Sequence, residues 1–99
     1  MSPEQVRGQE IDHRSDIFSL GAVAYYVLTS KLPFPGDETL LVTQRVVGEF
    51  PSPLRQYGHL HSPDSLQAIL FKAMAKKPED RFQTCTELAN ALEAWCHGP

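Results

Sequence analysis

A run of fourteen residues without charge, from Ile17 to Ser30, predicts a helix that is apolar on every face. Ser15 is expected to cap this helix, and Asp16 suits its positively polarised first turn. A helix of this kind is normally buried on all sides, yet a chain of 99 residues would leave one side in water. We therefore expect another structural element to cover this helix, and the chain to be part of a larger domain.

Turn-forming residues divide the neighbouring parts of the chain. Two prolines and a glycine in residues 31–36 end the first helix. A second helix is expected from Glu38 to Val47, with Gly48 at its end, and residues 49–62 are expected to form a loop. Residues 1–14 have no hydrophobic period and are also expected to form a loop.

Two further helices are predicted near the C-terminus by apolar residues spaced three and four apart. One should begin at Ser62 and Pro63 and close before Pro78, and the next should begin at a capping box of Thr84 and Glu87. Their apolar stripes are Leu66, Ile69, Leu70, Ala73 and Met74, and then Leu88, Ala91, Leu92 and Trp95. No segment has a strand pattern, so the expected fold class is all-α with four helices.

The charge distribution and the N-terminal sequence limit the possible partners. The net charge is −3 and the nine Lys and Arg residues are scattered, which argues against a nucleic-acid surface. The chain has no signal peptide pattern and no apolar run of about 20 residues, so neither secretion nor membrane insertion is expected.

The two cysteines, Cys85 and Cys96, are expected to be free thiols. They are eleven positions apart on one predicted helix, which corresponds to about 16 Å. A disulfide needs Cα atoms within about 7 Å, so these two cysteines cannot pair within the helix. Free thiols favour a cytoplasmic location.

Several motifs lie in the same order and at similar separations as in the C-terminal lobe of protein kinases. Met1-Ser2-Pro3-Glu4 resembles the Ala/Ser-Pro-Glu motif that closes the activation segment, and residues 12–21 resemble the Asp-x-x-Ser-Leu-Gly motif that opens the central helix. Residues 31–34 resemble the turn after that helix, and residues 78–82 resemble the segment that carries the family's arginine. Residues 1–99 thus resemble part of a bacterial, eukaryotic-like serine/threonine kinase domain, from the end of the activation segment through the last C-lobe helix.

The resemblance implies roles for three residues. Glu4 would form an ion pair with Arg81, whose planar guanidinium suits a partly buried carboxylate. Asp16 would anchor the catalytic loop by accepting hydrogen bonds from its backbone, although that loop is not found in this chain. The alternatives are that Glu4 and Arg81 are solvated surface charges, and that Asp16 only offsets the helix dipole.

The groups that bind ATP and transfer phosphate are not found in this sequence. It contains no Gly-x-Gly, His-Arg-Asp or Asp-Phe-Gly motif, so no catalytic, cofactor-binding or metal-binding residue is assigned. His13, His59 and His61 lack the cysteine or carboxylate neighbours of a metal site and are expected to be ordinary histidines. ATP and magnesium would be cofactors of the parent kinase domain, and the chain alone should not phosphorylate protein.

The expected function is therefore that of a non-catalytic part of a serine/threonine kinase. This part would hold the end of the activation segment and offer a docking surface, formed by the second helix and the loop after it. Its partners would be the remainder of the kinase domain and the protein substrates. The alternative is a stand-alone helical interaction module, whose expected mark is polar substitution on the central helix; Ile17 to Leu28 carry no charge, which counts against it.

Overall fold

The computed structural model describes residues 2–34, 46–58, 60 and 62–97. Its α-helices are α1 (Pro3–Val6), α2 (His13–Thr29), α4 (Pro63–Ala73) and α5 (Cys85–His97), joined by 3-10 turns η1 (Leu54–Gln56) and η2 (Pro78–Asp80). The described residues contain no strand, so the predicted all-α class is confirmed. Most of the helix predicted for residues 38–47 lies outside the described residues, and at its end residues 46–48 are helical.

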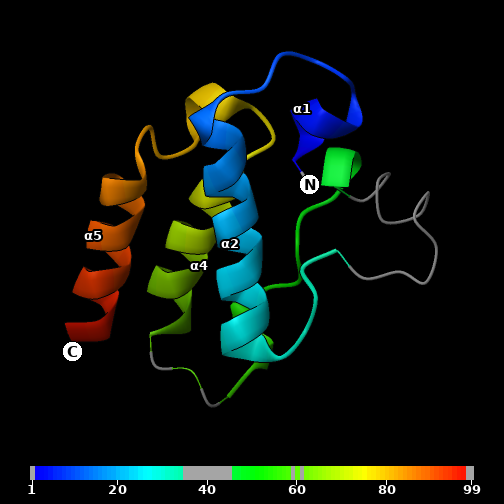
Figure 1. Cartoon of the computed structure of the whole chain (residues 1–99). Coiled ribbons are helices and arrows are strands. Elements are labelled where there is room, and N and C mark those ends of the chain that lie inside the picture. The colour runs from blue at the N-terminus through cyan, green and yellow to red at the C-terminus, as the bar shows by residue number, and fades with distance from the viewer. Residues whose placement is uncertain (1, 35–45, 59, 61, 98–99) are drawn as a thin grey trace.

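The three long helices form the body of the molecule (Figure 1). Helix α4 packs against both α2 and α5, and it also contacts η1. Its predicted apolar stripe supplies much of the core, where Leu66, Leu70, Ala73 and Met74 are at most 1% exposed. Helix α4 is therefore the central packing element of the described chain.

Gly21 allows α2 and α4 to approach each other closely. A Cβ atom at this position would lie 2.8 Å from the Cβ of Ala73 and 3.1 Å from Cγ of Met74. Contacts this short would force the two helices apart, since both neighbours belong to the tightly packed core. The glycine of the Ser-Leu-Gly motif is therefore explained by helix packing.

The N-terminal part of the chain differs from its prediction as a loop. Pro3–Val6 form α1, where the Ser2 and Gln5 side chains make a capping box, and α2 already begins at His13. Asp12 caps α2, because its Oδ1 atom accepts a hydrogen bond from the Arg14 amide at 2.8 Å. The prediction that Ser15 is the cap was wrong; Ser15 lies inside the helix and is buried.

The starts of the C-terminal helices agree more closely with the sequence. Thr84 Oγ1 accepts a hydrogen bond from the Glu87 amide at 3.1 Å, as the predicted cap requires. Ser62 occupies the cap position before Pro63, but its φ of 43° is left-handed and its side chain does not cap α4. Cys85 and Cys96 both lie on α5 as exposed free thiols.

Candidate functional site

The structure brings Glu4 and Arg81 together. Nη1 of Arg81 lies 2.7 Å from Oε2 of Glu4, and Nη2 lies 2.8 Å from Oε1, so the pair is bidentate. Both residues are buried, at 2% exposed for Arg81 and 4% for Glu4. They are 77 positions apart, so this contact fixes α1 to the segment between α4 and α5.

All five N–H groups of the Arg81 guanidinium have an acceptor. Besides the two bonds to Glu4, Nε donates to the Ala75 carbonyl at 2.8 Å. Nη1 also donates to the Arg14 carbonyl at 3.0 Å, and Nη2 donates to the Lys76 carbonyl at 3.3 Å. Full hydrogen bonding offsets much of the cost of removing this cation from water.

An aromatic ring and a hydroxyl complete the buried site. The Arg81 guanidinium carbon lies 4.9 Å from the centre of the Phe18 ring, within reach of a cation–π interaction. Ser15 Oγ donates a hydrogen bond to Oε2 of Glu4 at 2.6 Å. We call Glu4, Ser15, Phe18 and Arg81 the anchor cluster.

The hydrogen bonds of the anchor cluster set the charge of Glu4. Burial raises the pKa of this carboxyl, but hydrogen bonds from Arg81 and Ser15 oppose it and lower the pKa from 4.5 to about 2. Glu4 is therefore ionised at neutral pH, and its negative charge is matched by Arg81. From the sequence, Ser15 was expected only to cap α2. Its position about one helical turn before Phe18, on the buried face of the helix, was the signal that could have identified it as part of the site.

The hydrogen bonds of α1 hold Glu4 in position. The Ser2 amide donates to Oε1 of Gln5 at 2.7 Å, and the Gln9 amide donates to the Glu4 carbonyl at 2.9 Å. Ser2 and Pro3 are buried with Glu4. These bonds lie within residues 2–9, so the backbone around Glu4 has a defined local structure, and its side chain joins that structure to the helical body through Arg81.

Asp16 lies outside the anchor cluster. Its side chain is exposed in the first turn of α2, the position expected for a carboxylate that offsets the helix dipole. Within the described part of the chain, the Asp16 carboxylate has no hydrogen bond or ion pair. The structure therefore does not bring Asp16 together with Glu4 and Arg81.

The histidines considered as metal ligands do not form a site in the described residues. His13 Nε2 lies 2.6 Å from the carbonyl oxygen of Gln83, and His59 and His61 lie outside the described residues. The described residues contain no group of three His, Cys, Asp or Glu side chains that could hold a metal ion. Among them, too, no helix has the length and apolar character needed to cross a bilayer.

One face of α2 is apolar and exposed. Leu20, Val23, Tyr26 and Val27 are between 48% and 69% exposed, and we call these four residues the α2 face. The opposite face of the same helix is buried against the core through Ile17, Phe18 and Tyr25, which are at most 1% exposed.

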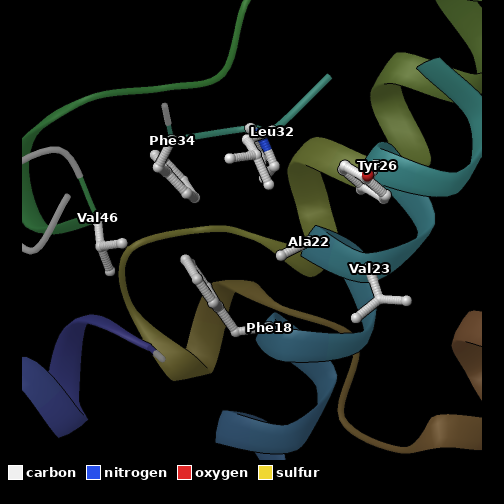
Figure 2. Close-up of a pocket in the computed structure, with 8 residues that line it drawn as sticks. Phe18, Ala22, Val23, Tyr26, Leu32, Phe34 and Val46 are labelled. Atoms are coloured by element: carbon white, nitrogen blue, oxygen red, sulfur yellow. The ribbon is translucent and has the colours of Figure 1, made fainter. Parts of the chain in front are cut away.

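Two apolar hollows flank the α2 face. The first has a volume of about 520 Å³, and Figure 2 shows Val23 and Tyr26 from α2 on one side of it and Phe34 and Val46 on the other. The second, of about 470 Å³, lies between α2 and α5. The first is lined by Phe18, Ala22, Val23, Tyr26, Leu32, Pro33, Phe34 and Val46, and the second by Leu20, Val23, Ala24, Val27, Leu28, Cys85, Leu88, Ala89 and Leu92. The α2 face and its hollows form a continuous surface that a packed structural element could cover.

In the described residues the body is all-helical, and a buried Glu–Arg pair joins its first helix to the segment before its last helix. This combination is characteristic of the C-terminal lobe of a protein kinase. No family model matches the chain. The chain is 47% identical over 88 residues to the serine/threonine-protein kinase PknB of Mycobacterium leprae, covering 89% of this chain and 14% of that protein. It is 46% identical over 96 residues to the tyrosine-protein kinase MasK of Myxococcus xanthus, covering 96% of this chain and 15% of MasK. A probable serine/threonine-protein kinase of Corynebacterium efficiens is 41% identical over 96 residues, covering 94% of this chain and 14% of that protein.

The chain is therefore homologous to a segment of bacterial protein kinases, and its helical fold is consistent with a fragment of a kinase C-terminal lobe. It spans about 14–15% of the length of these relatives.

Proposed function

We propose that this chain forms the lower C-terminal lobe of a kinase that transfers phosphate from ATP to protein serine and threonine, without supplying a catalytic group itself. The observation that carries the proposal is the buried Glu4–Arg81 pair, which joins the Ser-Pro-Glu segment to the helical body. In this reading residues 1–99 extend from the end of the activation segment through the last helix of the lobe. ATP and magnesium would bind to the rest of the kinase domain.

The anchor cluster would fix the end of the activation segment. A buried bidentate ion pair tolerates little displacement, because each partner would otherwise be left as an unpaired charge in the interior. The hydrogen bond from Ser15 and the four-residue helix α1 restrict Glu4 further. A rigid end allows the rest of a mobile segment to adopt a defined position.

The α2 face would seat the remainder of the kinase domain. Its four exposed side chains and the two hollows form a contiguous apolar surface, and such surfaces often mark interaction sites. Asp16 lies in the first turn of the same helix, where its exposed carboxylate is available to accept hydrogen bonds from the catalytic loop. A docking surface for substrates would be formed by the second helix, predicted for residues 38–47, and by the loop after it.

Serine/threonine specificity is proposed from the relatives. PknB and the Corynebacterium protein are named as serine/threonine kinases, whereas MasK is named as a tyrosine kinase. In kinases the substrate hydroxyl is positioned by the catalytic loop, which this chain does not contain. The identity of the phosphorylated residue therefore depends on groups outside residues 1–99.

The stand-alone interaction module is the alternative function. It would use the same α2 face, but to bind a separate protein. The absence of charge from Ile17 to Leu28 favours permanent packing over a surface that is repeatedly exposed to water.

A chimaeric kinase tests the proposal. The 88-residue matching segment of mycobacterial PknB is replaced by this chain, and phosphorylation of a protein substrate is measured. Activity comparable with PknB is expected, together with a strong loss when Arg81→Met is introduced into the chimaera. The matched control is Arg55→Met, which removes an exposed arginine that pairs with Asp64. An inactive but folded chimaera, or equal effects of the two substitutions, would contradict the proposal.

A further inference from the structure

The side chain of Lys76 contacts parts of the chain that are far apart in sequence. Its Nζ atom donates a hydrogen bond to the Val46 carbonyl at 2.6 Å. Three aromatic rings lie near the same atom, with ring centres at 4.5 Å for Phe34, 5.5 Å for Phe50 and 6.0 Å for Phe18. A cation at these distances is attracted by the faces of the rings. One ammonium group therefore joins α2, the turn after it and a segment near the middle of the chain.

The Val46 carbonyl needs a hydrogen-bond donor from outside its own helix. Residues 46–48 are helical and Glu49 is not, so Val46 lies in a last helical turn. Carbonyl groups in the last turn of a helix have no donor within the helix, and a positive charge there offsets the negative end of the helix dipole. Val46 is buried, so water is a poor substitute. The Lys76 ammonium supplies both the donor and the charge at this helix end.

The aromatic rings near Lys76 form two stacked pairs. Phe50 stacks on Phe71 of α4, with ring centres 6.3 Å apart and an angle of 18° between the planes. Phe18 of α2 stacks on Phe34, with ring centres 5.9 Å apart and an angle of 8°. The Lys76 amine lies within 5.5 Å of one ring from each pair. It therefore connects the pair that includes α4 with the pair that includes α2.

The Lys76 amine is charged at neutral pH. Burial lowers its pKa, Glu49 raises it, and Arg81 and Arg7 lower it, so that the pKa falls from 10.5 to about 8. About nine in ten Lys76 side chains therefore carry an ammonium at pH 7. The hydrogen bond and the attraction of the rings both require a donor with positive charge, whereas a neutral side chain of similar length would keep only the packing.

We propose that Lys76 is a positioning residue, whose ammonium holds residues 46–50 against α2 and α4. This segment lies where the expected second helix ends and the loop after it begins, so Lys76 would orient part of the docking surface for protein substrates. The docking role rests on the proposed function, but the contacts that hold the segment do not depend on it. Lys76 touches no substrate in this role and acts through residues 46–50.

Proteolysis of the complete chain tests whether Lys76 holds the segment. A Glu-specific protease cleaves after Glu49 when the surrounding segment opens locally. Lys76→Met removes the charge and keeps a long apolar side chain, so it should speed this cleavage at least tenfold. Lys76→Arg retains a cation, and its rate should stay within threefold of the unsubstituted chain. Lys72→Met is the matched control, because the Lys72 amine lies 4.5 Å from the Phe82 ring instead, and it should change the rate less than twofold.

Gly21→Ala separates opening of the segment from unfolding of the whole chain. It strains the contact between α2 and α4 and should lower global stability, but release of residues 46–50 does not relieve that strain. Cleavage after Glu49 should therefore change less than twofold in Gly21→Ala. An unchanged cleavage rate in Lys76→Met would overturn the proposal, as would acceleration of the same size in Gly21→Ala or Lys72→Met.

The chimaeric kinase tests the consequence for docking. Lys76→Met should raise the KM for the protein substrate at least threefold and change kcat less than twofold, because Lys76 supplies no catalytic group. Phe50→Leu removes one ring from the amine at a side chain that is 64% exposed, so it should raise KM in the same way without unfolding the chain. Unchanged kinetics, or a lower kcat at constant KM, would overturn the docking role. An unsubstituted chimaera without activity would refute the proposed function and the docking role with it, whereas the proteolysis result would still decide whether Lys76 holds the segment.

Discussion

Removing either partner of the Glu4–Arg81 pair should strongly destabilise the fold. Arg81→Met leaves the Glu4 carboxylate buried without its counter-ion, and Glu4→Gln leaves the guanidinium without its negative partner. Breaking a buried pair in this way typically costs about 3–5 kcal/mol. The pKa of Glu4 leads to a similar magnitude, because a shift from 4.5 to about 2 corresponds to roughly 3 kcal/mol.

A double-mutant cycle measured by urea and thermal unfolding provides the assay. Each single variant should lower the melting temperature by about 12 °C or more, given about 4–8 °C per kcal/mol for a domain of this size. The double variant should cost at least about 1 kcal/mol less than the sum of the single variants. Arg55 and Asp64 provide the control cycle, since their atoms lie 2.6 Å apart, against 2.7 Å in the buried pair, but their side chains are 76% and 63% exposed. Their coupling should be close to zero.

The pH dependence of stability gives an independent check with a fixed sign. The folded-state pKa of Glu4 is lower than its unfolded value, so its contribution is complete above about pH 4.5 and is lost as the pH falls toward 2. Glu4→Gln should flatten the stability profile in this window. Simple additivity in the Glu4–Arg81 cycle, or an acid profile that Glu4→Gln leaves unchanged, would refute the reasoning.

Three further predictions follow from other parts of the structure. ATP with Mg²⁺ should not raise the melting temperature of this chain, because the phosphate- and metal-binding motifs are missing; clear stabilisation in a thermal-shift assay would contradict this. The chain should bind hydrophobic dyes or self-associate through the α2 face, and Val23→Gln with Val27→Gln should reduce both effects at little cost in stability, since these side chains are 57% and 69% exposed. A clean monomer without dye binding in sedimentation would count against it. Gly21→Ala should lower the unfolding free energy by about 1–3 kcal/mol despite its better helix propensity, because the new methyl group meets Ala73 at 2.8 Å. Gly48→Ala, with open space around it, should show no such loss in the same denaturation experiment.

The helical architecture was largely predictable, because it depends on periodic apolar positions. The apolar stripes of residues 66–74 and 88–95 predicted helices α4 and α5, and the apolar run from Ile17 onward predicted α2. The start of α2 was missed because Asp12 and Ser15 are both good capping residues, and only the folded backbone decides between them. Helix α1 was missed because four residues are too few to show a period.

The anchor cluster was predictable only in part. The motif order implied by resemblance paired Glu4 with Arg81, although nothing in the local pattern connects residues 77 positions apart. The participation of Ser15 depends on where α1 packs, and no rule of helix propensity contains that information. The Lys76 amine lies among three separate segments, which contribute Phe18, Phe34 and residues 46–50, so its lowered pKa could not be predicted from the residues beside it in sequence.

The long separation of Glu4 and Arg81 also has a kinetic consequence. Contacts between α4 and α5 close short loops and can form early, whereas the Glu4–Arg81 contact must close a loop of almost the whole chain. We therefore expect this contact to form late, after the helical body has assembled. Substitutions in the pair should then mainly accelerate unfolding and leave the folding rate nearly unchanged. The stability of the Glu4–Arg81 pair would therefore set the unfolding rate, and with it the lifetime of the folded state.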